Sequence, residues 1–72
     1  MKIILPLNVK DRDIAKIVQI ANSTKKDVIA RSDRWVIDAK SLLGMIALFH
    51  EGLIVEIESE SKNTIEVINA LF

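Results

Sequence analysis

The feature that most constrains the fold of this chain is a pair of short apolar segments separated by two polar residues. Residues 27–31 (DVIAR) and 34–38 (RWVID) are rich in β-branched and aromatic residues, and Ser32 and Asp33 lie between them. Such segments are typical of strands, and a two-residue link is typical of a β-hairpin. Parallel strands need a much longer crossover connection. The sequence therefore predicts an antiparallel strand pair.

A helix and two further strands are indicated by their hydrophobic patterns. Residues 14–21 place Ile, Ile, Val and Ala at the i, i+3, i+4, i+7 spacing of an amphipathic helix, and Asp11 or Asp13 is expected to cap its first turn. Residues 2–7 (KIILPL) are typical of a strand that ends near its proline. Residues 53–58 (LIVEIE) alternate apolar and acidic, which predicts a strand with one face in water.

The chain ends in a predicted third helix, in which Ile65, Ile68 and Leu71 or Phe72 recur at helical spacing. Asn63 followed by Glu66 resembles a capping box at its start. With a helix over residues 41–51, described next, the order is β-α-β-β-α-β-α. The 72 residues make one domain, spanning 1–72. We expect an α+β fold in two layers, a four-stranded antiparallel sheet with the helices on one face.

The helix in residues 38–52 (DAKSLLGMIALFHEG) is apolar on almost every side. Ser41 is a good N-cap and Gly52 a plausible stop. The apolar positions that cover most of its circumference are Leu42, Leu43, Met45, Ile46, Leu48 and Phe49. A helix packed on a thin sheet buries only one stripe. Some of these side chains should therefore be exposed, and an exposed apolar patch usually marks an interaction surface.

Composition excludes several classes of function. Ten basic residues balance ten acidic ones, whereas a nucleic-acid-binding protein usually has a basic excess or stripe. The longest apolar run is far shorter than the roughly 20 residues that span a bilayer. One histidine and no cysteine cannot build a metal cluster, and two glycines make no phosphate-binding loop. We therefore expect no nucleic-acid, membrane, metal or cofactor binding. The absence of cysteine and of a targeting signal predicts a cytoplasmic protein.

Four residues carry charge or hydroxyl chemistry. Lys10 and Arg12 flank the start of the first helix, where free amides and cations favour an anion, although Asp11 and Asp13 oppose it. His50 lies near the end of the second helix, where a cation suits the negative end of the dipole. As an N-cap, Ser41 is worth about 1 kcal/mol. A phosphate at that position would add negative charge where the dipole stabilises it.

The stretch AKSLLGMIALFHEGLIVEIESE, residues 39–60, resembles HPr, the histidine phosphocarrier family of the bacterial sugar phosphotransferase system. A Lys-Ser pair, an apolar helix, a glycine turn and an alternating strand are similar to the family's regulatory-serine helix and the strand after it. The element order extends the resemblance over the whole chain. It implies the HPr fold, Ser41 as a regulatory site for an HPr kinase-like enzyme, and Leu42, Leu43 and Ile46 as a docking patch.

The first thirty residues depart from this family. Its members carry a Gly-His-x-Arg-Pro-Ala motif where the first helix begins, and here the stretch is NVKDRDIA, residues 8–15. Lys10 takes the place of the histidine, Arg12 matches the arginine, and Asp13 replaces the proline. A lysine ammonium has no free lone pair near neutral pH, so it cannot accept a phosphoryl group. The two aspartates would also repel a phosphorylated donor.

These observations favour a non-catalytic regulatory or protein-interaction module. It would bind a protein partner through Leu42, Leu43 and Ile46, with Lys10 and Arg12 at the rim and Ser41 as the switch. An alternative is a phosphocarrier whose acceptor has moved to His50, the only imidazole. A further alternative is a small homo-oligomeric structural protein in which the apolar helix is the self-interface.

Overall fold

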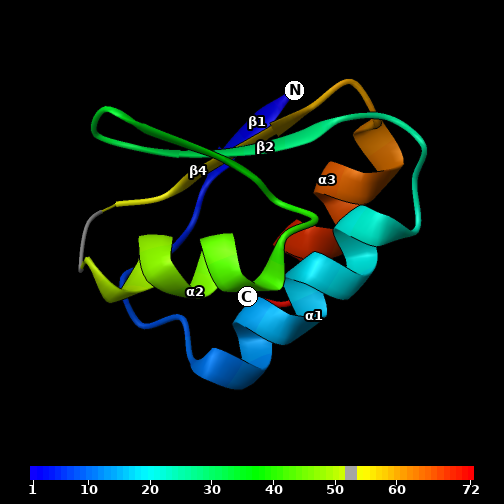
Figure 1. Cartoon of the computed structure of the whole chain (residues 1–72). Coiled ribbons are helices and arrows are strands. Elements are labelled where there is room, and N and C mark those ends of the chain that lie inside the picture. Colours follow the sequence, from blue (N-terminus) through cyan, green and yellow to red (C-terminus); the bar gives the residue numbers. More distant parts are fainter. Residues whose placement is uncertain (52–53) are drawn as a thin grey trace.

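The computed structural model of residues 1–72 describes residues 1–51 and 54–72 (Figure 1). The elements follow in the order β-α-β-β-α-β-α: β1 (Lys2–Ile4), α1 (Asp11–Asn22), β2 (Val28–Ser32), β3 (Trp35–Asp38), α2 (Leu42–His50), β4 (Glu56–Ser59) and α3 (Lys62–Asn69). This order confirms the prediction from the sequence. Gly52, the expected stop of α2, and Leu53 lie outside the described residues.

The four strands form one antiparallel sheet in the order β1-β4-β2-β3. β4, the last strand in the sequence, lies between β1 and β2, and Ile57 at its centre pairs with both Ile3 and Ala30. β1 and β3 are the edges. Within the described residues, no helix is long and apolar enough to cross a membrane.

The hairpin between β2 and β3 has its turn one residue later than predicted. Ser32 pairs with Trp35, so the turn residues are Asp33 and Arg34. Ser32 belongs to the strand because it is buried and its hydroxyl donates to the Ile54 carbonyl at 2.7 Å. Asp33 takes a φ of 54°, the left-handed conformation that two-residue hairpin turns require.

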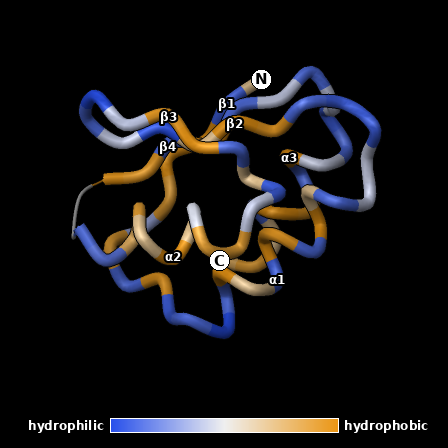
Figure 2. The backbone as a smooth tube through the Cα atoms, viewed as in Figure 1, coloured by the Kyte–Doolittle hydropathy of each residue, from blue (hydrophilic) through white to orange (hydrophobic). Residues whose placement is uncertain are grey.

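The three helices pack on one face of the sheet, below it in Figure 1, and leave the other face open. Hydrophobic stretches of the chain meet between the two layers (Figure 2). The buried apolar residues of α1 are the four predicted from its spacing, and those of α3 include Ile65 and Ile68. On the strand side Val28, Ala30 and Ile57 are fully buried. Each fully buried Ile or Val contributes about 1.5–3 kcal/mol relative to exposure.

Two helix starts differ in detail from the sequence prediction. Lys10 is the N-cap residue of α1, and Asp13 supports it by accepting from the Lys10 N–H at 3.1 Å. The expected cap at Asn63 is wrong, because α3 begins at Lys62 and Asn63 lies inside its first turn. Ser61 caps it and accepts from the Thr64 N–H at 3.3 Å.

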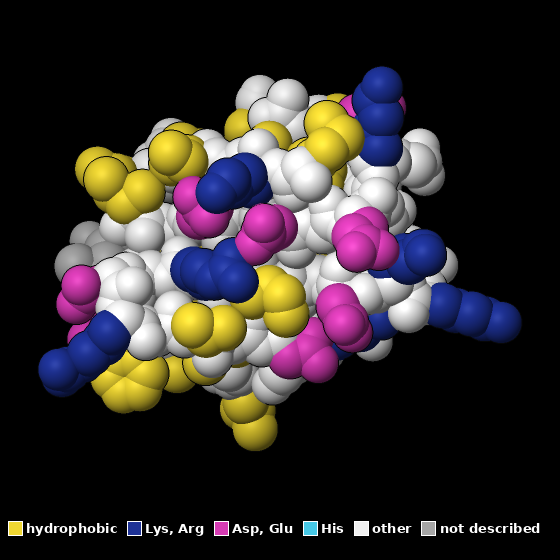
Figure 3. Space-filling view, turned by 90° about the horizontal axis from the view of Figure 1, so that it is seen from above, with side chains coloured by type: hydrophobic (Ala, Val, Ile, Leu, Met, Phe, Trp, Pro, Cys, Tyr) yellow, Lys and Arg dark blue, Asp and Glu magenta, His cyan; other side chains and the backbone are white. Residues whose placement is uncertain are grey.

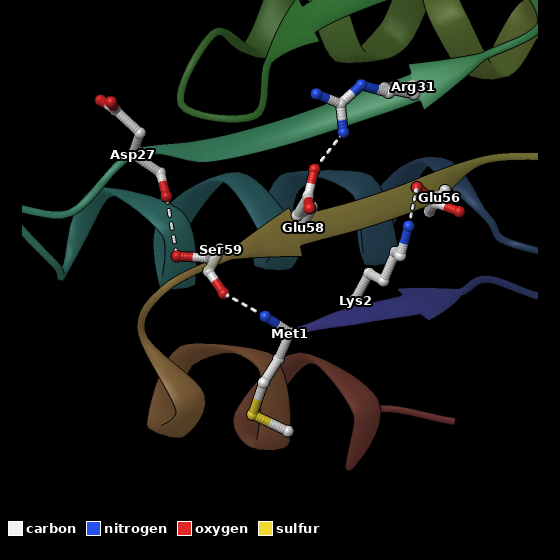
Figure 4. A network of polar contacts seen from close by, with 7 residues as sticks. All are labelled: Met1, Lys2, Asp27, Arg31, Glu56, Glu58 and Ser59. Atoms are coloured by element: carbon white, nitrogen blue, oxygen red, sulfur yellow. Dashed lines mark hydrogen bonds and ion pairs between the residues drawn. The ribbon is translucent and has the colours of Figure 1, made fainter.

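The open face of the sheet is covered by charged side chains of both signs, with hydrophobic side chains between them and around the margin (Figure 3). Lys2 Nζ lies 4.0 Å from Glu56 Oε1, and the Arg31 guanidinium donates a hydrogen bond to the Glu58 carboxylate (Figure 4). This hydrogen bond and the positive charge of Arg31 lower the pKa of Glu58 below its ordinary value of 4.5. Paired charges thus cross the face from β1 to β2.

Polar contacts also hold the end of β4. The N-terminal amine of Met1 donates to the Ser59 carbonyl at 2.9 Å, and the Ser59 hydroxyl donates to the Asp27 carbonyl at 2.7 Å (Figure 4). Ser59 is buried, so these bonds satisfy groups that would otherwise be costly to bury. They join Met1, just before β1, and Asp27, just before β2, to the end of β4.

Candidate functional site

The candidate site lies on the helix pair α1 and α2, which run antiparallel. At one end the Asn22 side-chain amide donates to the Lys40 carbonyl at 3.1 Å. At the other end His50 Nε2 lies 3.8 Å from Asp11 Oδ1. The start of α2 therefore lies beside the end of α1, and the end of α2 lies beside the start of α1.

Ser41 is the N-cap of α2, as predicted. Its backbone is extended, and its hydroxyl accepts a hydrogen bond from the Gly44 N–H at 3.2 Å. The Ser41 carbonyl accepts the first intrahelical bond, from Met45 N–H at 2.9 Å. The residue is exposed. The hydroxyl is thus accessible from solvent while it caps the helix.

The backbone before Ser41 is held by two side chains, Lys40 and Asn22, whose contacts the sequence analysis did not predict. The Lys40 ammonium donates to the Thr24 carbonyl at 2.8 Å, in the loop after α1. Asn22 donates to both the Val18 carbonyl, at 2.9 Å, and the Lys40 carbonyl. Lys40 therefore fixes the position of Ser41. No sequence spacing could reveal these contacts, because the bonded groups lie 16 and 18 residues apart.

The apolar residues of α2 divide between the core and the surface. Met45 and Leu48 are buried, and Ile46 and Phe49 are half-buried against the core. Leu42 is 44% exposed and Leu43 is 82% exposed. The expectation that α2 carries exposed apolar side chains is confirmed. Hereafter we call Leu42, Leu43 and Ile46 the α2 surface.

Lys10 and Arg12 lie at the other end of the helix pair from Ser41. Both are exposed, and they stand on either side of Asp11 at the start of α1. The nine residues of α2 separate this end from Ser41 by about 13 Å. The structure therefore does not gather the predicted residues at one point. It arranges them along one side of the molecule, with Ser41 and two leucines at one end and the two cations at the other.

His50 is brought to the start of α1 by the fold. Its side chain is 66% exposed, and Asp11 beside it is 84% exposed. The only imidazole of the chain thus lies next to the turn in which Lys10 stands. The sequence analysis placed His50 only on the end of α2, because its approach to Asp11 depends on how the two helices pack.

The described residues contain no group of three or more His, Cys, Asp or Glu side chains placed to hold a metal ion. What the arrangement offers chemically is an accessible hydroxyl at a helix N-terminus, an apolar surface beside it and two cations at a distance. These are recognition features, and the hydroxyl is the group that a modifying enzyme could use.

Comparison with known proteins places this geometry in a family. A sequence model described as "PTS HPr component phosphorylation site" matches residues 1–72. The crystal structure of HPr-C-His from Thermoanaerobacter tengcongensis is similar, with a TM-score of 0.80 and 20% sequence identity. The match covers 99% of this chain and 89% of the other, and at this identity it shows the fold. No curated protein matches the chain.

Proposed function

Because this chain belongs to the HPr family of the phosphotransferase system, we propose that it is a regulatory module that binds a protein partner and does not carry phosphate at the start of α1. HPr family proteins are phosphocarriers that interact with other proteins of this system. The observation that carries the proposal is the exposure of Leu42 and Leu43 beside the capped Ser41. We assign the α2 surface to partner binding, in the cytoplasm of a bacterium.

Lys10 is the reason for proposing that this chain, unlike the phosphocarriers of its family, does not accept a phosphoryl group at the start of α1. A protonated lysine amine has no lone pair with which to attack phosphorus. It keeps its positive charge, however, and with Arg12 it offers two exposed cations at the far end of the helix pair. In our proposal these cations contact acidic groups at the rim of the partner, which favours encounter more than affinity.

Ser41 is the proposed switch. An HPr kinase-like enzyme would transfer the γ-phosphoryl group of ATP to its hydroxyl oxygen, the hydroxyl proton would pass to a base of the kinase, and ADP would leave. The phosphate can accept the Gly44 N–H in place of the hydroxyl, and the helix dipole stabilises its charge. The fold is kept. The charge next to Leu42 must lose water when a partner covers the α2 surface, so binding weakens.

A phosphorylation assay with two donors tests the proposal. We expect an HPr kinase with labelled ATP to label the wild-type chain, and Ser41→Ala to abolish the label. Ser61→Ala is the matched control, because Ser61 caps α3 through the same kind of bond and should not affect labelling. We expect no acid-labile label from phosphoenolpyruvate and the general phosphotransferase enzymes. Kinase labelling that persists in Ser41→Ala would contradict the assignment of the switch.

The α2 surface can be tested in the same assay. Leu42→Lys adds a charge where we expect the kinase to dock, so kcat/KM for labelling should fall about tenfold or more. Val67→Lys on α3 is the control, because Val67 is 41% exposed and Leu42 is 44% exposed. Equal effects of the two variants would show that the α2 surface has no special role.

His50 offers a second candidate function, a phosphocarrier with a relocated acceptor. The observation that favours it is the position of the exposed imidazole beside the first turn of α1, 3.8 Å from Asp11. A neutral imidazole has the lone pair that Lys10 lacks. The phosphoenolpyruvate arm of the assay distinguishes the two functions. Acid-labile label that disappears in His50→Gln would establish the carrier and reject the non-catalytic module.

A further inference from the structure

The edge strand β3 has one side that no strand covers. Its pairing with β2 determines which of its residues bond to β2 and which present their backbone groups to that open side. Among the described residues β3 pairs with β2 alone. The Ala39 N–H donates to the Val28 carbonyl at 2.8 Å, and in an antiparallel ladder alternate residues bond to the same partner. Trp35 and Ile37 therefore bond to β2. Val36 presents its N–H and C=O to the outer side.

The side chains of β3 also alternate in a regular way. Val36 pairs with Arg31, lies on the open face and is 60% exposed. Trp35 and Ile37 point to the helix side, where they help line an apolar hollow of about 120 Å³ against Ala47 and Leu48 of α2. Trp35 remains 49% exposed. Both sides of this edge therefore expose apolar surface.

A charge of each sign stands at the two ends of β3. Arg34 lies in the turn before the strand, and Asp38 is its last residue. Both are exposed, and within residues 1–51 and 54–72 neither forms an ion pair. Residues 34–38 are therefore, in order, one basic residue, three apolar residues and one acidic residue. When two copies of this segment lie antiparallel, the basic end of each lies opposite the acidic end of the other, and their apolar residues face each other.

We propose that β3 pairs with β3 of a second copy of this chain, antiparallel and about a two-fold axis through Val36. This register sets Arg34 opposite Asp38 of the second copy, Trp35 opposite Ile37, and Val36 opposite Val36. The outward backbone groups of the two Val36 residues can then bond each other directly. Opposite charges and apolar pairs that face each other across strands are stabilising. The sheet continues through both molecules.

Other registers are worse for the same residues. A shift by one residue sets outward backbone groups against groups already bonded to β2. A shift by two in one direction sets Arg34 opposite Lys40, and in the other direction it sets Ile37 opposite Asp33. The other edge, β1, has a single charge, Lys2, so it offers no such complementarity. Only the two-fold register through Val36 satisfies both the charges and the apolar side chains.

Sedimentation equilibrium and Trp35 fluorescence test this pairing on the whole chain. The contact is short, so we expect a weak, concentration-dependent dimer. The mass should rise from the monomer towards twice that value with increasing concentration. The emission of Trp35, the only tryptophan, should shift to the blue as its indole is covered. A wild-type chain that stays monomeric up to its solubility limit would overturn the proposal. Arg34 and Asp38 would then prevent β3 from pairing with another strand.

Matched variants locate the contact. Val36→Lys sets two ammonium groups together at the two-fold axis, so the dimer dissociation constant should rise about tenfold or more. Leu43→Lys, at an even more exposed apolar position on α2, should leave it unchanged. Loss of self-association in Leu43→Lys but not in Val36→Lys would place the interface on α2 and reject the β3 contact. The proposed function does not depend on the β3 contact, whereas self-association through Leu43 would favour the homo-oligomeric alternative over it.

A charge-swap mixture tests the register. Arg34→Asp alone and Asp38→Arg alone each create two like-charge pairs, so each should be monomeric. Mixed, they restore two opposite-charge pairs, and a heterodimer should form. Asp38 also accepts from the Lys40 N–H at 2.9 Å, so thermal melts must show that its variant folds. If it does not fold, Val36→Lys decides the question. Folded variants that fail to associate when mixed would show that the register is wrong.

Discussion

At the scale of single residues, Ser41 combines a structural role with an accessible hydroxyl. We expect Ser41→Ala to lower the free energy of unfolding by about 1 kcal/mol, because the Gly44 N–H loses its side-chain acceptor. In a domain of this size that corresponds to roughly 4–8 °C in Tm. Ser41→Asp should be close to wild type, because its carboxylate accepts the same bond and suits the helix dipole. Thermal melts of the three proteins measure both effects.

The two variants separate the cap from the switch. If Ser41→Asp is as unstable as Ser41→Ala, the hydroxyl does not act as a helix cap in solution, and the alignment behind its regulatory role is wrong. If Ser41→Asp is stable and its binding to a partner is unchanged, the residue is a cap and nothing more. Stable protein with weakened binding is the outcome that fits a switch.

Glu58 gives the open face a pH dependence whose sign follows from its lowered pKa. The hydrogen bond and charge of Arg31 stabilise the ionised carboxylate in the folded state. The resulting stability is present above the ordinary pKa of 4.5 and is lost as pH falls through the folded-state value. We expect the difference in Tm between wild type and Glu58→Gln to shrink on acidification. Arg31→Gln should remove the same pH dependence, and a difference that grows on acidification would contradict this account.

At the scale of elements, the packing of α2 on β3 depends on Gly44. A Cβ placed there would lie 2.7 Å from Ile37 Cγ2, too close for van der Waals contact. Gly44→Ala should gain up to about 1 kcal/mol of helix propensity but lose about 1–3 kcal/mol to overpacking. We expect a net loss of about 1 kcal/mol in urea unfolding.

The matched background for this test is Ile37→Ala, which removes the obstructing methyl group. In that background Gly44→Ala should stabilise, because the gain in helix propensity then outweighs the one close contact that remains, 3.2 Å between the added Cβ and Ser41 Oγ. The sign change between the two backgrounds measures the coupling of α2 to β3. An equal effect of Gly44→Ala in both backgrounds would show that the two elements pack less closely than the structure indicates.

At the scale of the whole molecule, the fold could be predicted because local patterns agreed with one another. The hairpin forced antiparallel pairing, and the spacing of Ile14 and Ile17 marked the buried face of α1. What could not be predicted depends on contacts between distant residues. Ser61 and Asn63 are both good caps, and only the structure decides between them. Two contacts follow from helix packing, which sequence spacing does not predict. They are the approach of His50 to Asp11 and the hydrogen bond from Lys40 to the Thr24 carbonyl.

The position of β4 in the sheet has a consequence for the order in which the chain can assemble. β2 and β3 are neighbours in sequence and can form their hairpin early, since closing a two-residue turn costs little chain entropy. β1 emerges first from synthesis, yet Lys2 pairs with Glu58, so β1 has no strand to join until β4 has been made. The strand that completes the sheet is the last one in the sequence, and it inserts between two strands that came before it. Folding of this small domain is therefore held back until β4 has been made.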